Sequence, residues 1–324
     1  MRGEAVDAPR QAEPANYFSN GNFEVGLPTS EWCTPYASYS SLRPEYLIGS
    51  GGSDGGAYLC MPLYQHYEGK PITLELMHRV MKLQPNTTYY FRGMFKAAAP
   101  MEMGLHAETA YGKQTTFGRQ KATLGSTWQE VKYSFKTPSD IRGCYFVINA
   151  SAKEPAKLLI DELSLSSAPR EAFTPSAGVE VGLTWKPVGK VFYADQPVEF
   201  SVRTRKYDPA AKAEIRCRVI NYFDQQVFEK TLSADLAGSA VQTQTLQLPN
   251  DATGSFRLLV DGVVTATAGR YDLPIQEYVY CVVPQPPAKM LGTLGAYTSI
   301  VPDAIETMSR AGIRRTTTDR KSVV

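Results

Sequence analysis

Six aromatic residues in loop-like stretches are the first candidates for a binding role: Trp32, Tyr36, Tyr39, Tyr64, Tyr67 and Tyr111. Gln114 and Arg119 follow the last of these in the run YGKQTTFGR and would supply hydrogen-bonding groups. Aromatic rings beside amide and guanidinium groups suit a ligand with flat apolar faces and polar edges, such as a pyranose ring. The alternative is that tyrosine, with 19 copies, is abundant and simply fills a core.

Two carboxylates, Glu24 and Asp161, are the candidates for a metal site. They stand near the start and the end of the first strand-rich segment. If the first and last strands of that segment run side by side, the carboxylates repel each other unless a cation or hydrogen-bond donors compensate. Ca²⁺ takes its oxygen ligands from carboxylates and backbone carbonyls, so these side chains and loop carbonyls would suffice. The alternative is a pair of solvated charges.

Catalytic chemistry has little support. No nucleophile motif stands beside the three histidines, which are His66, His78 and His106. We expect His78 and His106, which fall in strand-like runs, to pack or to form hydrogen bonds. The five cysteines form no C-x-x-C pair, which argues against a zinc knuckle. Cys217 and Cys281 could join the two sheets of a sandwich, or all five cysteines could be small buried hydrophobic residues.

Composition excludes other classes of function. The net charge of +2 indicates no nucleic-acid partner. No apolar run approaches the roughly 20 residues that span a bilayer. Residues 1–16 are polar and lack the apolar core of a signal peptide, so we expect a disordered leader there.

The elements that would position these residues are β-strands. In KLLIDELSLS, the residues Leu159, Asp161, Leu163 and Leu165 alternate with others and are expected to share one face. Runs of the same kind, which we also expect to be strands, are TLELMHRV (73–80), TTYYFRGMF (87–95), VKYSFKT (131–137) and GCYFVINA (143–150). Gly- and Pro-containing turns separate them, which favours a sandwich or jelly roll.

Residues 179–283 contain a second set of strand-like runs: QPVEFSVRTR, AEIRCRVINY, TQTLQLP, GSFRLLVDG and YVYCVVP. FDQQ (223–226) is expected to be a hairpin turn. The number and spacing of these strands suit an immunoglobulin-like sandwich.

Proline-rich segments mark the expected boundaries, near 168–178 and after Val283. In residues 284–324 the spacing of apolar residues changes from that of a strand to that of a helix. Val301, Ile305 and Met308 share one helical face between two short strand-like runs. The predicted fold class is therefore all-β, with two tandem β-sandwiches and a short C-terminal βαβ stub. The expected organisation is a leader (1–16), a jelly roll (17–167), a linker (168–178), an immunoglobulin-like sandwich (179–283) and the stub (284–324).

Four motifs of the first segment, in order along the chain, carry a family resemblance: SNGNFEVG, LQPNTTYYFRGMFKA, STWQEVKYSFKTP and LLIDELSL. The segment resembles carbohydrate-binding modules of families four, nine and twenty-two, the cellulose- and xylan-binding type. The middle of the segment, 31–65, shows no motif of the family. The last segment, with MSRAGIRRTTTD, resembles the start of a (β/α)₈-barrel glycoside hydrolase, cut short.

The resemblance implies a function and a place for several residues. It implies that the chain is a glycan-binding accessory region of a secreted multimodular glycoside hydrolase, inactive by itself, with a polysaccharide or oligosaccharide as partner. It places a structural Ca²⁺ at Glu24 and Asp161, and Trp128 in the core. It also implies secretion or cell-surface display, and we expect a monomer. A catalytic hydrolase and a cell-surface adhesion or scaffold protein remain the alternatives.

Overall fold

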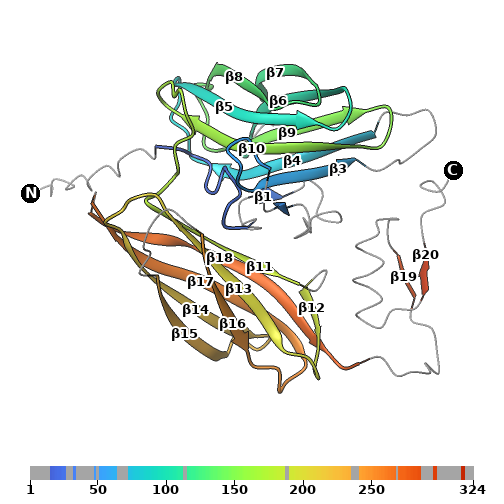
Figure 1. Cartoon of the computed structure of the whole chain (residues 1–324), viewed down its shortest axis with the longest axis vertical. Helices are drawn as coiled ribbons and strands as arrows, with labels where there is room; N and C mark the ends of the chain where they lie inside the picture. The colour runs from blue at the N-terminus through green and yellow to red at the C-terminus, as the bar shows by residue number, and fades with distance from the viewer. Residues whose placement is uncertain are drawn as a thin grey trace, which may run out of the picture.

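The computed structural model describes residues 15–26, 32–33, 47–48, 51–63, 72–111, 115–186, 190–234, 241–267, 269–285, 295–297 and 315–317. Over these ranges the chain is all-β and contains no helix, which confirms the predicted all-β class. No helix within them is long and apolar enough to cross a membrane. Two β-sandwiches follow one another along the chain (Figure 1).

The first sandwich consists of two five-stranded sheets. Sheet A contains, in spatial order, β1 (Trp32–Cys33), β4 (Ile72–Met81), β9 (Cys144–Ala152), β6 (Met101–Thr109) and β7 (Thr116–Leu124). Sheet B contains β2 (Leu47–Ile48), β3 (Tyr58–Leu63), β10 (Ala156–Ser166), β5 (Thr88–Ala97) and β8 (Gln129–Lys136). The strand pairs in both sheets are antiparallel.

Alternate residues of both sheets meet in one apolar core. Strand β5 shows the pattern most clearly, because every second residue from Tyr89 to Ala97 is buried and the residues between them are half-exposed. Phe91 of sheet B stacks on Phe146 of sheet A with ring centroids 5.0 Å apart. Aromatic residues of this size contribute much of the apolar area that a sandwich core removes from water.

The second sandwich pairs a three-stranded sheet with a five-stranded sheet. Sheet C contains β11 (Val179–Trp185), β13 (Val198–Lys206) and β16 (Gln242–Leu248). Sheet D contains β12 (Val191–Tyr193), β18 (Gly269–Val283), β17 (Gly254–Ala266), β14 (Lys212–Asn221) and β15 (Gln226–Ala234). The expected turn at 223–226 lies between β14 and β15. Among the described residues, no sheet crosses the 168–178 linker.

A β-bulge in β10 changes the expected face of that strand. The pairing with β5 shifts register between Asp161 and Ser164, and Glu162 adopts a positive φ of 49°. The predicted alternation through Leu159 is therefore wrong before the bulge, where Leu158 and Ile160 enter the core instead. The extra residue changes the phase of the strand, so that Leu163 and Leu165 enter the core after the bulge.

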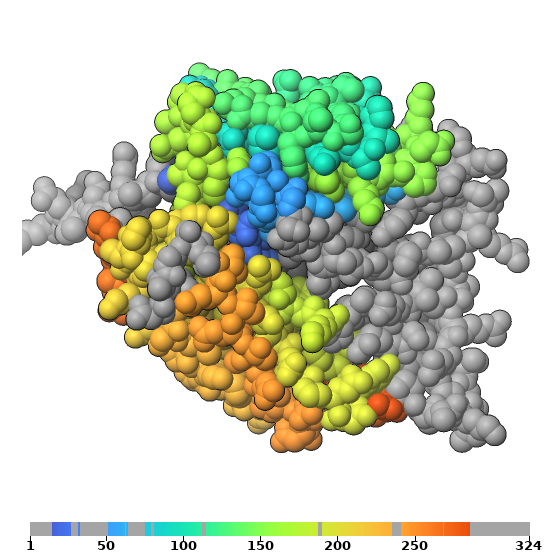
Figure 2. All heavy atoms as spheres, viewed as in Figure 1, coloured from blue at the N-terminus to red at the C-terminus, as the bar shows by residue number. Residues whose placement is uncertain are grey.

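Residues 15–26 lie between the two sandwiches, where Figure 2 shows the N-terminal atoms in blue. Asn16 donates through Nδ2 to Leu163 O at 3.0 Å and to Thr174 O at 2.9 Å. Glu24 pairs with Arg205 of the second sandwich, with Nη1 and Oε1 3.3 Å apart. The two sandwiches are therefore joined by polar contacts as well as by the linker.

Glycine allows the closest approach at this junction. A Cβ at Gly182 would lie 2.3 Å from the Val25 carbonyl oxygen, so no larger residue fits there without a shift. Gly26, with φ of 100°, would bring a Cβ within 2.9 Å of Leu183 O.

Neither tryptophan of the first sandwich has the burial that was expected of it. Trp32 is 1% exposed, its indole N–H donates to Ser19 O, and its ring packs edge-on against His78. Its prediction as a ligand-stacking residue is wrong, because its strand points the ring into the core. Trp128 was expected in the core, yet it is half-exposed in the turn before β8 and contacts Tyr58.

Two further expectations concern the cysteines and the C-terminal segment. Cys217 and Cys281 are both free, and they lie on β14 and β18 of the same sheet with β17 between them, so they cannot join two sheets. In the C-terminal segment, β19 (Gly295–Tyr297) and β20 (Arg315–Thr317) form a parallel pair. The helix expected between them falls outside the described residues.

Candidate functional site

The outer face of sheet A carries a set of polar side chains that lie in register across its strands. On β9, Phe146 and Ile148 enter the core, so Tyr145, Asn149 and Ser151 point outward. On β6, the buried residues alternate with outward ones in the same way. The outward residues of these two strands are Tyr145, Val147, Asn149, Ser151, Glu102, Gly104, His106 and Glu108.

The cross-strand register arranges these residues in rows across the sheet. One row runs Glu75, Asn149, Gly104 and Lys121, from β4 to β7. Asn149 lies over Gly104, where an added Cβ would be 2.2 Å from Asn149 Oδ1. Glycine at this position therefore makes room for a carboxamide in the middle of the sheet.

An imidazole and a carboxylate stand beside that row. His106 Nε2 and Glu108 Oε1 are 3.1 Å apart, and both side chains are partly buried. Val147, the partner of His106 across the strands, is only 3% exposed although it faces outward. A polar pair held in a partly desolvated setting forms stronger hydrogen bonds than the same pair in water.

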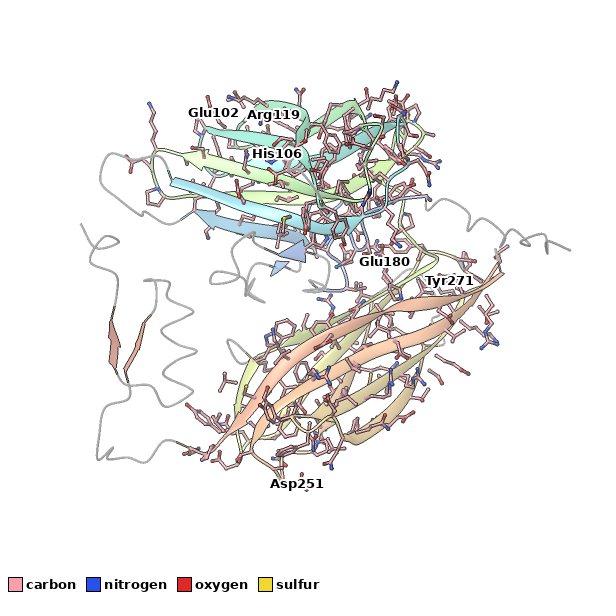
Figure 3. The ribbon with its side chains drawn as sticks, turned by 180° about the vertical axis from the view of Figure 1, so that it is seen from behind. Glu102, His106, Arg119, Glu180, Asp251 and Tyr271 are labelled. Atoms are coloured by element: carbon pink, nitrogen blue, oxygen red, sulfur yellow. The ribbon has the colours of Figure 1, made fainter. Side chains whose placement is uncertain are left out.

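Two of the predicted binding residues belong to the hairpin that borders this face. Tyr111 stands in the turn between β6 and β7 and is 60% exposed. Arg119 lies on β7 and is exposed, and Figure 3 shows it on the same part of the first sandwich as Glu102 and His106. The other predicted positions, Tyr36, Tyr39, Tyr64, Tyr67 and Gln114, fall outside the described residues.

Sequence reasoning missed Asn149, Glu108 and Tyr145, and assigned His106 only to packing or hydrogen bonding. A signal for β6 was present, because Met101, Met103, Leu105 and Ala107 alternate with polar residues. That period of two would have placed His106 and Glu108 on the outward face. No local signal marks Asn149, because its position follows from the pairing of β9 with β6.

The candidate metal pair faces one loop, residues 51–57. Asp161 Oδ2 accepts hydrogen bonds from Ser53 N and Ser53 Oγ, both at 2.8 Å. Glu24 Oε1 accepts a hydrogen bond of 2.7 Å from Ala57 N. The two carboxylates of the predicted pair therefore contact the same loop, and their role as Ca²⁺ ligands stays a prediction.

Burial is the main influence on the pKa of Asp161. Asp161 is fully buried, and desolvation raises its pKa to about 7, with a smaller contribution from the charge of Asp54. The hydrogen bonds from Ser53 and Glu162 oppose that rise. A buried acid near a second carboxylate is a setting that a cation would stabilise.

The groups around Glu24 and Asp161 meet the needs of a bound cation only in part. The described residues contain no group of three acidic, histidine or cysteine side chains arranged to hold a metal. Backbone N–H groups and Arg205 already supply donors to Glu24 and Asp161. A Ca²⁺ there would be held by Glu24, Asp161 and loop carbonyls, and its contribution would be charge neutralisation.

Comparison with known proteins gives structural neighbours only. No protein-family model matches the sequence, and no curated protein matches it significantly. A family 61 carbohydrate-binding module in complex with β-1,4-galactotriose is 13% identical, covers 47% of this chain and 97% of its own, and has a TM-score of 0.34. The N-terminal cellulose-binding domain of Cellulomonas fimi β-1,4-glucanase C is 16% identical, with coverages of 49% and 99% and a TM-score of 0.34.

A third neighbour is the CBM22-1 xylan-binding domain of Paenibacillus barcinonensis Xyn10C. It is 15% identical, covers 48% of this chain and 96% of its own, and has a TM-score of 0.32. All three neighbours are carbohydrate-binding modules, and each is similar to just under half of the present chain.

Proposed function

We propose that the first sandwich binds a polysaccharide on the outer face of sheet A. The observation that carries the proposal is the row of Glu75, Asn149, Gly104 and Lys121, with His106 and Glu108 beside it. Amide, imidazole and carboxylate groups together donate to and accept from sugar hydroxyls. Their partial burial reduces the cost of removing them from water when a sugar binds.

Aromatic residues stand at one end of the same face. Tyr145 pairs in register with Glu108, and Tyr111 follows in the next turn. An exposed tyrosine ring offers a flat apolar surface to the C–H side of a pyranose and keeps a hydroxyl for hydrogen bonding. A β-linked chain lying along the strands would contact the polar rows and then these rings.

The wider setting follows from the same proposal and from the resemblance of the sequence. The chain would be an extracellular, glycan-binding accessory region of a glycoside hydrolase, with no hydrolytic activity by itself. Its second sandwich would be immunoglobulin-like and would act as a spacer. Glu24 and Asp161 would hold a structural Ca²⁺.

Affinity electrophoresis in gels that contain mixed-linkage glucan, xylan or galactan tests the binding. We expect retardation by at least one β-linked polysaccharide. The double variant His106→Ala with Asn149→Ala should weaken that retardation at least about tenfold, which is a loss of about 1.4 kcal/mol. Lys136→Ala, an exposed change on sheet B, is the matched control and should leave it unchanged.

Two outcomes contradict the proposal. If none of the polysaccharides retards the protein, it does not bind β-linked glycans of these kinds. Retardation that survives the double variant, in a protein with unchanged melting temperature, places the binding site elsewhere.

A further inference from the structure

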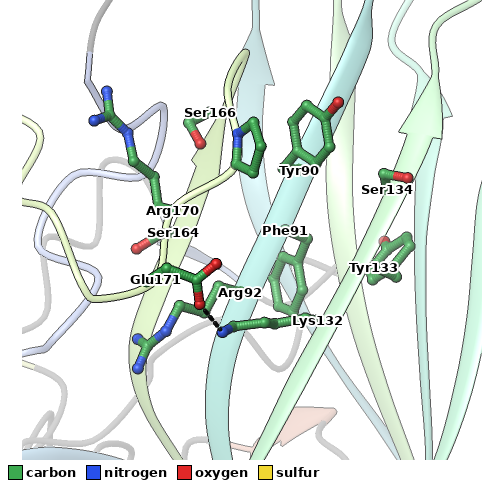
Figure 4. A pocket seen from close by; sticks show the side chains of 11 residues that line it. Tyr90, Phe91, Arg92, Lys132, Tyr133, Ser134, Ser164, Ser166, Arg170 and Glu171 are labelled. Carbon is green, nitrogen blue, oxygen red and sulfur yellow. Dashed lines mark hydrogen bonds and ion pairs between the residues drawn. The ribbon is translucent and has the colours of Figure 1, made fainter.

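A hollow lies on sheet B of the first sandwich, opposite the sheet A face. It has a volume of about 260 Å³ and opens between strands β10, β5 and β8 and the first residues of the linker. Figure 4 shows Tyr90, Ser164, Ser166 and Lys132 around it, with Glu171 of the linker over one side. The sheet A face described above shares none of these residues.

The floor of this hollow holds a hydroxyl with no hydrogen-bond partner. Ser164 is 2% exposed, and within the described part of the chain its Oγ has no partner. Buried polar groups are nearly always hydrogen-bonded, so such an atom indicates a water or ligand that completes it. Ser134 lines the same hollow from the neighbouring strand β8.

A tyrosine ring forms the other part of the floor. Tyr90 is half-exposed on the outward face of β5, and it pairs in register with Ser166 on one side and Ser134 on the other. An aromatic face flanked by hydroxyls is the combination that a pyranose ring contacts through its C–H side and its edge.

Two of the three cations that line the hollow, Arg92 and Lys132, are held in ion pairs. Arg92 forms ion pairs of 2.7 Å with both Glu130 and Glu162. Lys132 pairs with Glu171 at 3.0 Å and with Glu130 at 3.1 Å. Because Arg92 and Lys132 are already neutralised, the one lining cation left for an anionic ligand is the exposed Arg170, which has no ion pair within the described residues. A neutral, hydroxyl-bearing ligand fits this balance better.

We propose that this hollow binds a single neutral sugar unit, with Tyr90 against the ring and Ser164 hydrogen-bonded to a hydroxyl. The volume is below the roughly 300–1,000 Å³ of sites for drug-sized ligands, so it suits one sugar unit and not a longer chain. The site lies where the linker leaves sheet B, and the Lys132–Glu171 ion pair closes one side of it. The first sandwich thus has two glycan sites on opposite sheets.

Saturation-transfer-difference NMR on the full chain tests this site. The probes are the methyl β-glycosides of glucose, galactose and xylose, with glucuronate as the charged comparison. We expect transfer to at least one neutral glycoside and weaker transfer to glucuronate. Ser164→Ala and Tyr90→Ala should each weaken binding of that glycoside at least about tenfold.

Matched variants separate this site from the sheet A face. Ser164→Ala removes an unpaired hydroxyl, so it should leave the melting temperature unchanged or slightly higher, which keeps the binding result interpretable. Arg119→Ala and the double variant His106→Ala with Asn149→Ala should leave glycoside binding intact. Ser164→Ala should in turn leave polysaccharide retardation in gels intact.

The results that overturn the inference are distinct from those that overturn the proposed function. Transfer to no neutral glycoside, or stronger transfer to glucuronate, rules out a neutral sugar in the hollow. Glycoside binding that is lost on the sheet A substitutions and kept in Ser164→Ala assigns the sugar to sheet A and leaves the hollow without one.

Discussion

Two buried carboxylates, Asp161 in the first sandwich and Glu180 in the second, have nearly the same hydrogen-bond donors and different uses. Ser53 donates to Asp161 Oδ2 through both its N–H and its hydroxyl, each at 2.8 Å. Ser176 donates to Glu180 Oε1 in the same two ways, at 3.4 and 3.1 Å. Each carboxylate also accepts from a further backbone N–H.

The difference lies in what each carboxylate joins. The partners of Asp161 are the 51–57 loop and its own strand, all within the first sandwich. Glu180 accepts from Asn20 N of the N-terminal segment at 3.1 Å and from Tyr207 OH at 3.2 Å. Figure 3 shows Glu180 at the junction of the two sandwiches. The same local chemistry thus anchors a loop in one place and joins two domains in the other.

The charge environment differs as well. Desolvation raises the pKa of both acids, and hydrogen bonds oppose the rise in both. Asp161 additionally has Asp54 nearby, whose charge raises its pKa further. Hydrogen-bond donors reach both oxygens of each acid. The nearby charge of Asp54 is therefore the reason that a cation would help Asp161 more than Glu180.

The largest expected effect is that of Glu180→Ala on stability. The change would leave the Asn20 N–H, the Ser176 hydroxyl and the Tyr207 hydroxyl with fewer acceptors at a buried site. Each unsatisfied buried group costs roughly 1–3 kcal/mol, so we expect a loss of about 3–5 kcal/mol in the free energy of unfolding. Chemical denaturation measures it.

Glu214→Ala is the matched control, because Glu214 is an exposed strand residue of the same sandwich. It should change the free energy of unfolding by less than about 0.5 kcal/mol. Equal effects of the two substitutions would show that Glu180 has no special role at the junction.

The pH dependence of Asp161 is the next largest effect. Its pKa is raised to about 7 in the folded chain, from 3.8, so the folded state binds more protons than the unfolded state between those values. The contribution of this acid to stability is therefore greatest at low pH and falls as the pH rises from about 4 to 7. We expect a change of about 2–4 kcal/mol at most across that range.

Comparison with Asp161→Asn isolates this contribution, because other groups titrate alike in both proteins. The stability of the wild type relative to Asp161→Asn, measured in chelator, should be lower at pH 8 than at pH 4.5. A difference that stays constant, or that rises with pH, would mean that the carboxylate is not held in a raised-pKa state.

Calcium provides the third test, with a smaller effect. A ligand that binds only the folded state stabilises it by about 2.7 kcal/mol at a concentration of 100 Kd. We expect Ca²⁺ to raise the melting temperature at pH 8 in the wild type and in Glu180→Gln, but not in Asp161→Asn. No rise in the wild type would contradict a Ca²⁺ at Asp161 and leave the hydrogen-bonded loop as the whole explanation.

The sequence predicted the strands of the sandwich cores better than the residues at their surfaces. Alternation located β5, β8 and β9 because one face of each strand enters a core, and burial of one face is what alternation records. Strand β7 has polar residues on both faces and lies at a sheet edge, so its period is weak. The bulge at Glu162 reversed the expected face of β10, since one extra residue changes the phase.

The tryptophans and the acids show why sites are harder to predict than strands. Nothing in the sequence around Trp32 or Trp128 indicates which ring is covered, because their burial depends on distant segments. Glu24 and Asp161 were paired from their motif positions, and the 51–57 loop indeed contacts both. Glu180 escaped notice because it acts through Asn20, which lies 160 residues away in the chain.

The smallest expected effects are those of Ser53→Ala and Ser176→Ala. These changes test the comparison of Asp161 with Glu180 most directly. Each change removes one hydroxyl donor and keeps the backbone N–H, so we expect each to cost about 1–2 kcal/mol in the free energy of unfolding. The Ser53 hydroxyl is closer to its carboxylate, at 2.8 Å against 3.1 Å, so its loss should cost more. Ser53→Ala should also raise the pKa of Asp161 further, because a donor that favours the charged form is gone.

Denaturation at pH 8 and pH 4.5 separates the two serines. The cost of Ser53→Ala should be larger at pH 8, where the Asp161 carboxylate is charged and the hydrogen bond is charge-assisted. With Ca²⁺ present, that cost should shrink, because the cation takes over part of the neutralisation. The cost of Ser176→Ala should not change with Ca²⁺. Equal responses of both serines to Ca²⁺ would show that the two carboxylates do not differ in their need for a cation.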